Sequence, residues 1–190
     1  MGTVLDVVWP IALGVGLAAA CGLRVFLPLF FTSVLAHFNV GDVGLREGFG
    51  WLAEWPALLA LGVATVAEAA AYYIPVMDHA LDVIAVPLST VAGTLVAMST
   101  FVDLPPALSW GLALVAGGGV AGLVSAGTAA ARLGSSLKTA GLGNPVVATA
   151  ETGGAIGLSL LAWFIPLLAL VLVLILLVAV LRRVTRRARS

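Results

Sequence analysis

Residues 145–181 read PVVATAETGGAIGLSLLAWFIPLLALVLVLILLVAVL, a stretch in which Glu151 is the single charged side chain. As one helix it would measure about 55 Å at 1.5 Å per residue, whereas the hydrocarbon core of a bilayer is about 30 Å thick. Trp163 and Pro166 mark the place where it would divide. We expect one helix that ends near residue 164 and another that starts at Pro166. A single long, tilted helix is the alternative.

The whole composition agrees with a membrane location. Hydrophobic residues make up 62% of the chain and charged residues only 9%, against about 25% charged residues in soluble domains. Too few polar side chains are present to cover the surface of a water-soluble fold. The sequence therefore predicts an all-α, polytopic transmembrane helical bundle that forms a single integral membrane domain over residues 1–190.

Upstream of residue 145, four more apolar stretches are long enough to be membrane helices. They cover residues 9–38, 56–74, 78–101 and 107–131. The first exceeds the roughly 20 residues of a straight crossing and contains Arg24, Pro28 and several glycines. We expect it to be a broken or strongly tilted helix. The total is about six membrane helices, some of them broken or kinked.

The orientation follows from the distribution of basic residues. Five of the nine lie in the tail of residues 182–190, and lysine and arginine accumulate on the cytoplasmic side of membrane proteins. The tail is therefore expected to be cytoplasmic, and with six helices the amino terminus is too. Arg132 and Lys138, in a predicted polar connector over residues 132–143, would then also face the cytoplasm. With five helices they would lie outside, so the charges favour six.

Three charged residues fall deep inside predicted helices, namely Arg24, Glu68 and Glu151. A bare carboxylate at such depth costs several kcal/mol, so it must be protonated, hydrated or paired. The structural interpretation is that Arg24 neutralises one glutamate in a buried ion pair. One base cannot neutralise both acids. The surplus acid would be protonated, bind a cation or reach water, which is the behaviour of a proton or cation path.

Two further groups of residues are candidates for chemistry. Asn144 and Pro145 are typical of a helix start, whose positive end can face an anionic group. Asp78, His79 and Asp82 can share one side of a helix and bind a divalent metal or pass protons. Alternatively, Asp78 caps a helix and Asp82 lies near the positive end of its dipole. No strong metal-binding motif occurs, so any metal stays unknown, and no cofactor is predicted.

Small and hydroxyl residues form two helical stripes. Ser89, Thr90 and Thr94 fall on one side of the predicted helix over residues 78–101, as part of a stripe that also contains Gly93, Ala97 and Thr100. This stripe is either a polar cavity wall or a helix-packing surface. Gly118 and Gly122 have the spacing of a close helix contact. We expect such glycine-rich faces to pack helices together, either within the chain or in a homo-oligomer.

Several of these residues belong to recognisable motifs. The motifs are GLRVFLP at residues 22–28, IPVMD at 74–78, and GLGNPVV at 141–147, together with Glu68, Asp82 and Glu151. The pattern, which covers residues 10–165, resembles a bacterial membrane family, the domain of unknown function numbered 4126. Tyr73 stands where many relatives are expected to have a basic residue. The resemblance implies a small multi-pass protein of the bacterial inner membrane without an established activity. It selects Arg24, Glu68, Asp78, Asp82, Asn144 and Glu151.

The first functional hypothesis is a small transporter or channel for a cation or a proton-coupled solute. Arg24 would organise the site, and Glu68 and Glu151 would carry protons or bind the cation. The alternatives are a non-transporting scaffold or accessory subunit, and a membrane enzyme that acts on a lipid-linked substrate at the Asp78, His79 and Asp82 cluster. We favour a non-enzyme. The expected partner is the lipid bilayer; no nucleic acid is expected, because the basic tail directly follows a membrane helix.

Overall fold

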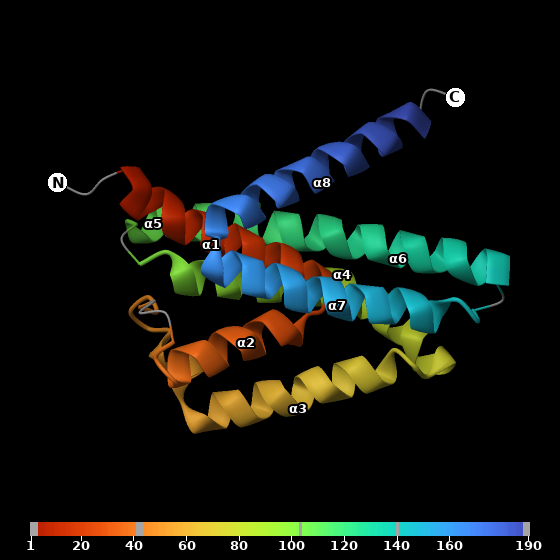
Figure 1. Cartoon of the computed structure of the whole chain (residues 1–190), viewed down its shortest axis with the longest axis horizontal. Coiled ribbons are helices and arrows are strands. Elements are labelled where there is room, and N and C mark those ends of the chain that lie inside the picture. Colours follow the sequence, from red (N-terminus) through yellow and green to blue (C-terminus); the bar gives the residue numbers. More distant parts are fainter. Residues whose placement is uncertain (1–3, 41–43, 103, 140, 188–190) are drawn as a thin grey trace.

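In the computed structural model, the described residues form helices joined by short connections, and no strand occurs among them. The structure describes residues 4–40, 44–102, 104–139 and 141–187, and at residues 4–6, 75–80, 180–181 and 183–187 it describes the backbone without the side chains. The elements are α1 (Val4–Leu23), α2 (Phe26–His37), the 3₁₀ turn η1 (Gly50–Ala53), α3 (Trp55–Ala71), α4 (Pro75–Thr100), α5 (Pro106–Leu112), the π-helical segment η2 (Ala113–Gly118), α6 (Gly119–Thr139), α7 (Asn144–Phe164) and α8 (Pro166–Arg187) (Figure 1).

The predicted all-α membrane bundle is confirmed. Within the described residues, three helical segments are long and apolar enough to cross a membrane: Leu81–Thr100, Pro106–Thr139 and Asn144–Phe164. Shorter apolar helices cover Val7–Leu23, Phe26–His37, Trp55–Ala71 and Pro166–Ala179. Large apolar side chains on α3 and α8 point out of the bundle, as expected for helix faces in contact with lipid tails.

A proline lies at the start of most helices. Pro56, Pro75, Pro106, Pro145 and Pro166 each occupy one of the first two positions of a helix, where the missing N–H has no helical partner in any case. At the last of these positions the chain reverses, so that α7 and α8 form a hairpin (Figure 1). The two-helix prediction for residues 144–181 is confirmed, and the alternative of one long helix is wrong.

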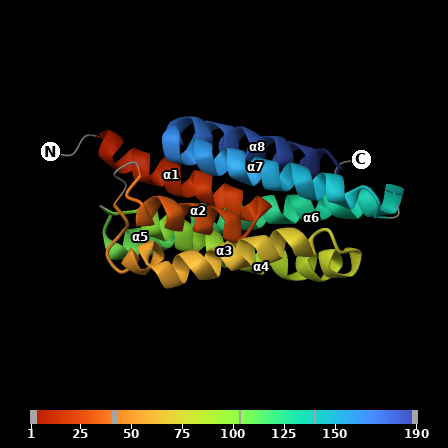
Figure 2. The same cartoon turned by 60° about the horizontal axis from the view of Figure 1, so that its bottom comes forward.

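The first apolar stretch differs from its prediction. It is broken, as one of the two expectations had it, and the break lies between Leu23 and Phe26, because Pro28 cannot donate a hydrogen bond to the carbonyl of Arg24 and its ring would clash with it. However, α2 does not continue in the direction of α1 but returns antiparallel to it (Figures 1 and 2). Residues 9–38 are therefore a helical hairpin rather than one broken crossing.

Hydrogen bonds fix the direction of this hairpin. The Thr100 hydroxyl, at the end of α4, donates to the carbonyl of Pro10 near the start of α1 at 3.3 Å. The backbone N–H of Arg46, after α2, donates to the carbonyl of Ser99 at 2.8 Å. The start of α1 and the connection after α2 thus lie at the same end of the bundle. The end of α8 lies at the opposite end (Figures 1 and 2). The prediction that both termini share one side assumed a single first crossing, and the hairpin removes that basis.

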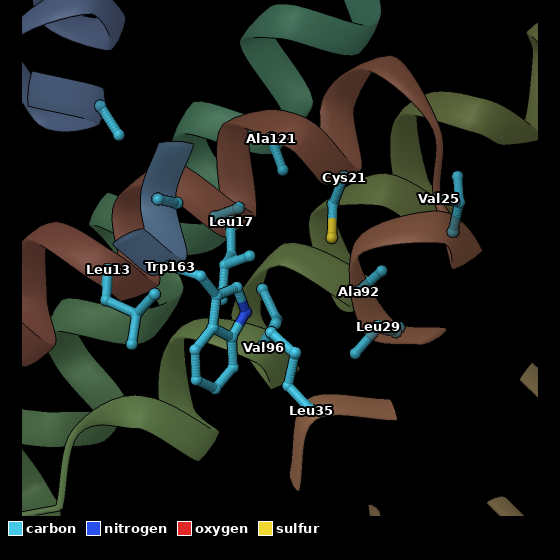
Figure 3. Close-up of a cluster of buried hydrophobic side chains, with 13 residues drawn as sticks. Leu13, Leu17, Cys21, Val25, Leu29, Leu35, Ala92, Val96, Ala121 and Trp163 are labelled. Atoms are coloured by element: carbon cyan, nitrogen blue, oxygen red, sulfur yellow. The ribbon is translucent and has the colours of Figure 1, made fainter. Parts of the chain in front are cut away.

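Helix α1 forms the centre of the bundle. Residues 12–22 are all buried, and α1 contacts α4, α6, α7 and α8. Figure 3 shows Leu13 and Leu17 of α1 next to Trp163 of α7 and Val96 of α4. Small residues let neighbouring backbones approach: a Cβ added at Gly22 would lie 2.5 Å from the carbonyl oxygen of Ala121. Because many side chains of α1 are small, the neighbouring helices can pack closely around it and form the buried core.

Candidate functional site

An arginine that the sequence placed in a connector lies inside the bundle. Helix α6 continues to Thr139, so Arg132 is a helical residue and its side chain is only 2% exposed. Its Nε donates to Oε1 of Glu151 at 3.1 Å, and its Nη2 donates to the other carboxylate oxygen. Its Nη1 lies 3.6 Å from Oδ1 of Asp82, which is 22% exposed. Arg132 thus joins α6 to both α7 and α4.

The spacing of small residues contains a signal for Arg132. Gly118, at the end of η2, shares one face with Gly122 and Ser125 of α6. Arg132 follows Ser125 by seven residues, which is two helical turns. If this small-residue face is extended by two turns, Arg132 lies on it and is predicted to point into the bundle. Its position also reduces the basis for the predicted orientation, because Lys138 alone remains of the two basic residues that favoured six helices.

Arg24 follows α1 at the break and reaches α7. Its Nε donates to the hydroxyl of Thr152 at 2.9 Å, and its Nη2 donates to the carbonyl of Ala148 at 2.8 Å. The same Nη2 lies 3.8 Å from Oε2 of Glu151. Nη1 of Arg24 is buried and has no hydrogen-bond partner in the described part of the chain. Both arginines therefore approach one carboxylate, and Arg24 has a further donor that could bind an acceptor.

The ring of Tyr72, just after α3, is in contact with both guanidinium groups. The central carbon of Arg24 lies 4.1 Å from the ring centroid and that of Arg132 lies 3.8 Å from it. An aromatic ring attracts cations at both faces through its quadrupole. The ring thus stabilises two like charges that would otherwise repel each other at short range.

This arrangement predicts that the ring of Tyr72 matters more than its hydroxyl. Tyr72→Phe keeps both aromatic faces and should change the free energy of unfolding little. Tyr72→Leu removes both cation–π contacts and should cost about 1–3 kcal/mol. Thermal unfolding of the purified protein in detergent measures the difference. Equal melting temperatures for the two variants would contradict a role for the ring faces.

Glu68 has a structural partner that the sequence did not indicate. Its carboxylate oxygens accept hydrogen bonds from the backbone N–H groups of Val25 and Phe26, at 2.8 and 3.0 Å. These N–H groups open α2, where no intrahelical carbonyl is available to them. Glu68 of α3 thus caps the first turn of α2 from outside, at the positive end of its dipole. Arg24 and Arg132 also act on this carboxylate electrostatically.

The cap can be tested by shortening the side chain. Glu68→Ala leaves two buried N–H groups without their acceptors, so the expected loss of stability is about 1–3 kcal/mol. Glu68→Gln keeps one acceptor oxygen and should lose less. The melting temperature in detergent should be highest for the wild type, lower for Glu68→Gln and lowest for Glu68→Ala. If Glu68→Ala and the wild type have the same melting temperature, the two hydrogen bonds do not hold α2 in place.

The charged residues form one cluster near the end of the bundle where α8 ends. Glu68 lies three residues before the end of α3, and Arg132 lies seven before the end of α6. Seven residues correspond to about 10 Å of helix. Among the described residues, three carboxylates now face two guanidinium groups, because Arg132 and Asp82 join Arg24, Glu68 and Glu151. The expectation of a single deep base was wrong, yet the described acids still outnumber the bases.

Each glutamate also lines a cavity of its own. A cavity of about 270 Å³ between the start of α2, α3 and α4 is lined by Glu68, Tyr72 and apolar side chains that include Leu81. A second cavity, of about 400 Å³, lies between α6, α7 and α8 and is lined by Glu151. Both volumes are close to the range of small-molecule sites. Arg24, Arg132 and the Tyr72 ring that both contact lie in the same charge cluster as the two carboxylates that line these cavities.

The other predicted site residues have different surroundings. Asn144 is the first residue of α7 rather than its cap, and its Nδ2 donates to the hydroxyl of Ser136 at 3.0 Å. Helix α4 begins at Pro75, so Asp78 cannot cap it as the sequence suggested. The side chains of Asp78 and His79 lie outside the described residues.

The hydroxyl stripe of α4 packs against the glycine face that follows α5. Ser89 and Thr90 both donate to the carbonyl of Val86, at 2.9 and 2.8 Å. A Cβ at Gly118 would lie 2.4 Å from Oγ1 of Thr94. This is the arrangement of the packing interpretation, and neither of the two cavities at the glutamates is lined by Ser89, Thr90 or Thr94. A homo-oligomer through the glycine faces stays a prediction.

The fold and the buried charges define a helical membrane protein with an internal cluster of ion pairs. Residues 11–186 match the model of a family described as a domain of unknown function, DUF4126. The chain belongs to this family, as the GLRVFLP and GNPVV motifs indicated, and the match extends the resemblance through α8. No curated protein and no solved structure matches the chain.

Proposed function

We propose that the protein is a small transporter or channel that moves protons or cations through the buried charge cluster. One observation carries the proposal: Glu151 is shared by Arg24 and Arg132 and also lines a cavity. A carboxylate with alternative positive partners can exchange one for another. A carboxylate in a fixed, fully enclosed pair would have no such exchange.

The exchange gives the cluster two arrangements. When a proton or cation reaches Glu151 from the cavity, the attraction between this carboxylate and the Arg132 guanidinium weakens. The guanidinium then favours Asp82, which it already approaches to 3.6 Å and which is the most exposed acid of the cluster. The proton or cation leaves when the Arg132–Glu151 pair forms again. Each step transfers charge between neighbouring groups without leaving a bare charge in the bilayer.

The proposed orientation follows the basic residues at the end of α8, which favour the cytoplasmic side of a bacterial inner membrane. The charge cluster would then lie nearer the cytoplasm, and the start of α1 would lie on the other side. Labelling of single cysteines introduced at Lys138 and at Glu54, in whole cells, tests this orientation. A membrane-impermeant reagent should label the Glu54 position and not the Lys138 position, after Cys21 has been replaced by alanine.

Flux through purified protein in liposomes tests the transport proposal. Wild-type protein should dissipate a proton, sodium or potassium gradient faster than empty liposomes. Glu151→Gln should slow this flux about a hundredfold if the carboxylate carries the proton or cation. Glu54→Gln is the matched control, because Glu54 is exposed and lies outside the cluster. Size-exclusion profiles establish that each variant is folded, and Asp82→Asn replaces Glu151→Gln if the latter is not. The absence of flux with all three ions would refute the proposal.

A non-transporting scaffold is the second candidate, and a specific observation favours it. The Arg132–Glu151 pair is bidentate and nearly inaccessible, as expected of a purely structural ion pair. In that case Glu151→Gln should lower the melting temperature while the liposomes show no flux for any variant.

A further inference from the structure

Two buried polar groups on α7 have no hydrogen-bond partner in the described part of the chain. They are the Ser159 hydroxyl and the indole N–H of Trp163. Ser159 is fully buried and Trp163 is only 7% exposed. Buried polar groups in proteins are almost always paired, either with protein atoms or with ordered water. Two such exceptions on one helix therefore point to a partner that is not a protein atom.

The two groups lie on neighbouring turns of one face of α7. Residues four apart on a helix have Cβ atoms about 5–6 Å from each other, and a long helical side chain extends back over the turn before its own. The Trp163 ring therefore extends toward Ser159. Figure 3 shows this ring next to Leu17 of α1 and Val96 of α4, with its nitrogen inside the cluster of buried side chains. The hydroxyl and the indole are not bonded to each other, so a common third partner can serve both.

The Ser159 hydroxyl differs from other buried hydroxyls of the bundle. Those of Ser89, Ser99 and Thr100 each donate to the carbonyl three residues earlier in their own helix, at 2.8–2.9 Å. Rotation of the side chain makes such a local bond available to a serine within a helix. Ser159 does not form it, so its hydroxyl is oriented toward a different partner.

We propose that Ser159 and Trp163 together bind one internal water molecule in the core of the bundle. An indole N–H only donates, whereas a hydroxyl both donates and accepts. The oxygen of one water molecule can accept from both groups, and its hydrogens can bind helical carbonyls, which keep a second lone pair. Immobilising one water costs less free energy than leaving two buried polar groups unpaired.

Other ligands suit this pair of side chains less well. Neither side chain is charged, so an ion would lose its hydration shell without a compensating charge. An apolar molecule would leave both polar groups unpaired. The site is also separate from the charge cluster, because Ser159 lies eight residues beyond Glu151 on α7, which is about 12 Å of helix. The inference therefore goes beyond the proposed function and does not depend on ion flux.

A density map at a resolution that shows ordered water tests the site directly. The protein in lipid nanodiscs should show a peak about 2.7–3.2 Å from both Oγ of Ser159 and Nε1 of Trp163. Ser159→Ala should lose most of this peak, because one of the polar partners of the water is removed. Ser89→Ala is the matched control, because Ser89 is also fully buried but already donates within its own helix. This control should keep the peak.

Ultraviolet resonance Raman spectroscopy gives a second readout in solution. The difference between the wild type and Trp163→Phe isolates the indole signal of Trp163, whose frequency depends on whether the N–H is hydrogen-bonded. We expect a hydrogen-bonded N–H. A free N–H would refute the proposal, as would a map with no peak or with a direct hydrogen bond between the two side chains. If Trp163→Phe does not fold, the map decides alone.

The outcome is separable from that of the proposed function. A bound water at Ser159 and Trp163, without ion flux in liposomes, keeps the site and removes transport. Flux that depends on Glu151, without a peak at Ser159 and Trp163, keeps transport and removes the site.

Discussion

Arg132→Met should lower the free energy of unfolding more than any substitution of Tyr72, Glu68 or Gly117. Methionine replaces the aliphatic part of the arginine side chain but leaves the Glu151 carboxylate without its bidentate partner. Removing one member of a buried ion pair typically costs about 3–5 kcal/mol, because the remaining charge is left uncompensated. The expected result is a large fall in the melting temperature in detergent, accompanied by loss of the monodisperse size-exclusion peak on mild heating.

The double variant Arg132→Met with Glu151→Met provides the control for this experiment. Replacing both members of a buried pair by apolar side chains of similar volume is often nearly neutral. Much of the stability lost in Arg132→Met should therefore return in the double variant, which gives a favourable coupling energy in a double-mutant cycle. If the two single changes simply add, the carboxylate and guanidinium do not depend on each other, and the cluster is not held by this pair.

Gly117→Ala is also expected to have a large effect, although it adds only one methyl group. A Cβ at this position would lie 2.6 Å from Cβ of Ala97 and 2.7 Å from the carbonyl oxygen of Gly93 in α4. The second of these atoms belongs to the backbone, so a side-chain rotation cannot relieve the clash. Overpacking of this kind costs about 1–3 kcal/mol, and α4 must separate from the π-helical segment η2.

Gly119→Ala, two residues further along, is the matched control. An added Cβ there meets no atom within 4 Å, and alanine is favoured over glycine in a helix by roughly 0.5–1 kcal/mol. Gly119→Ala should therefore melt at or above the wild-type temperature, whereas Gly117→Ala should melt well below it. A fall of similar size in both variants would mean that these glycines are required for a reason other than contact with α4.

The sequence was sufficient to predict the helices and most of the buried charges. Apolar length and the positions of proline determine where helices begin, and the depth of Arg24, Glu68 and Glu151 distinguished them from ordinary surface charges. Arg132 was missed because it is the first residue of a short polar stretch that also contains Lys138. In a mostly apolar chain, such a stretch is typical of a connection between helices. The helix nevertheless continues for two turns past it, since its side chain is compensated by carboxylates from α4 and α7 that lie far away in sequence.

The direction of α2 is a second feature that the sequence could not determine. Pro28 indicates that the helix breaks near Arg24, but a break permits either a kink or a reversal. The choice depends on partners elsewhere in the chain, because Glu68 supplies acceptors to the first N–H groups of α2 and the Ser33 hydroxyl donates to the carbonyl of Leu52 at 2.6 Å. Such long-range contacts leave no periodic signal in the sequence.

The central place of α1 also has a consequence for how the protein is made. This helix is synthesised before α4, α6, α7 and α8, the helices that surround it. Until they arrive, its glycines and alanines face lipid or the insertion machinery instead of neighbouring backbones. The contacts between α1 and α8 can therefore form only after α8 has been synthesised. The packing around α1 accordingly joins segments that are far apart in the order of synthesis.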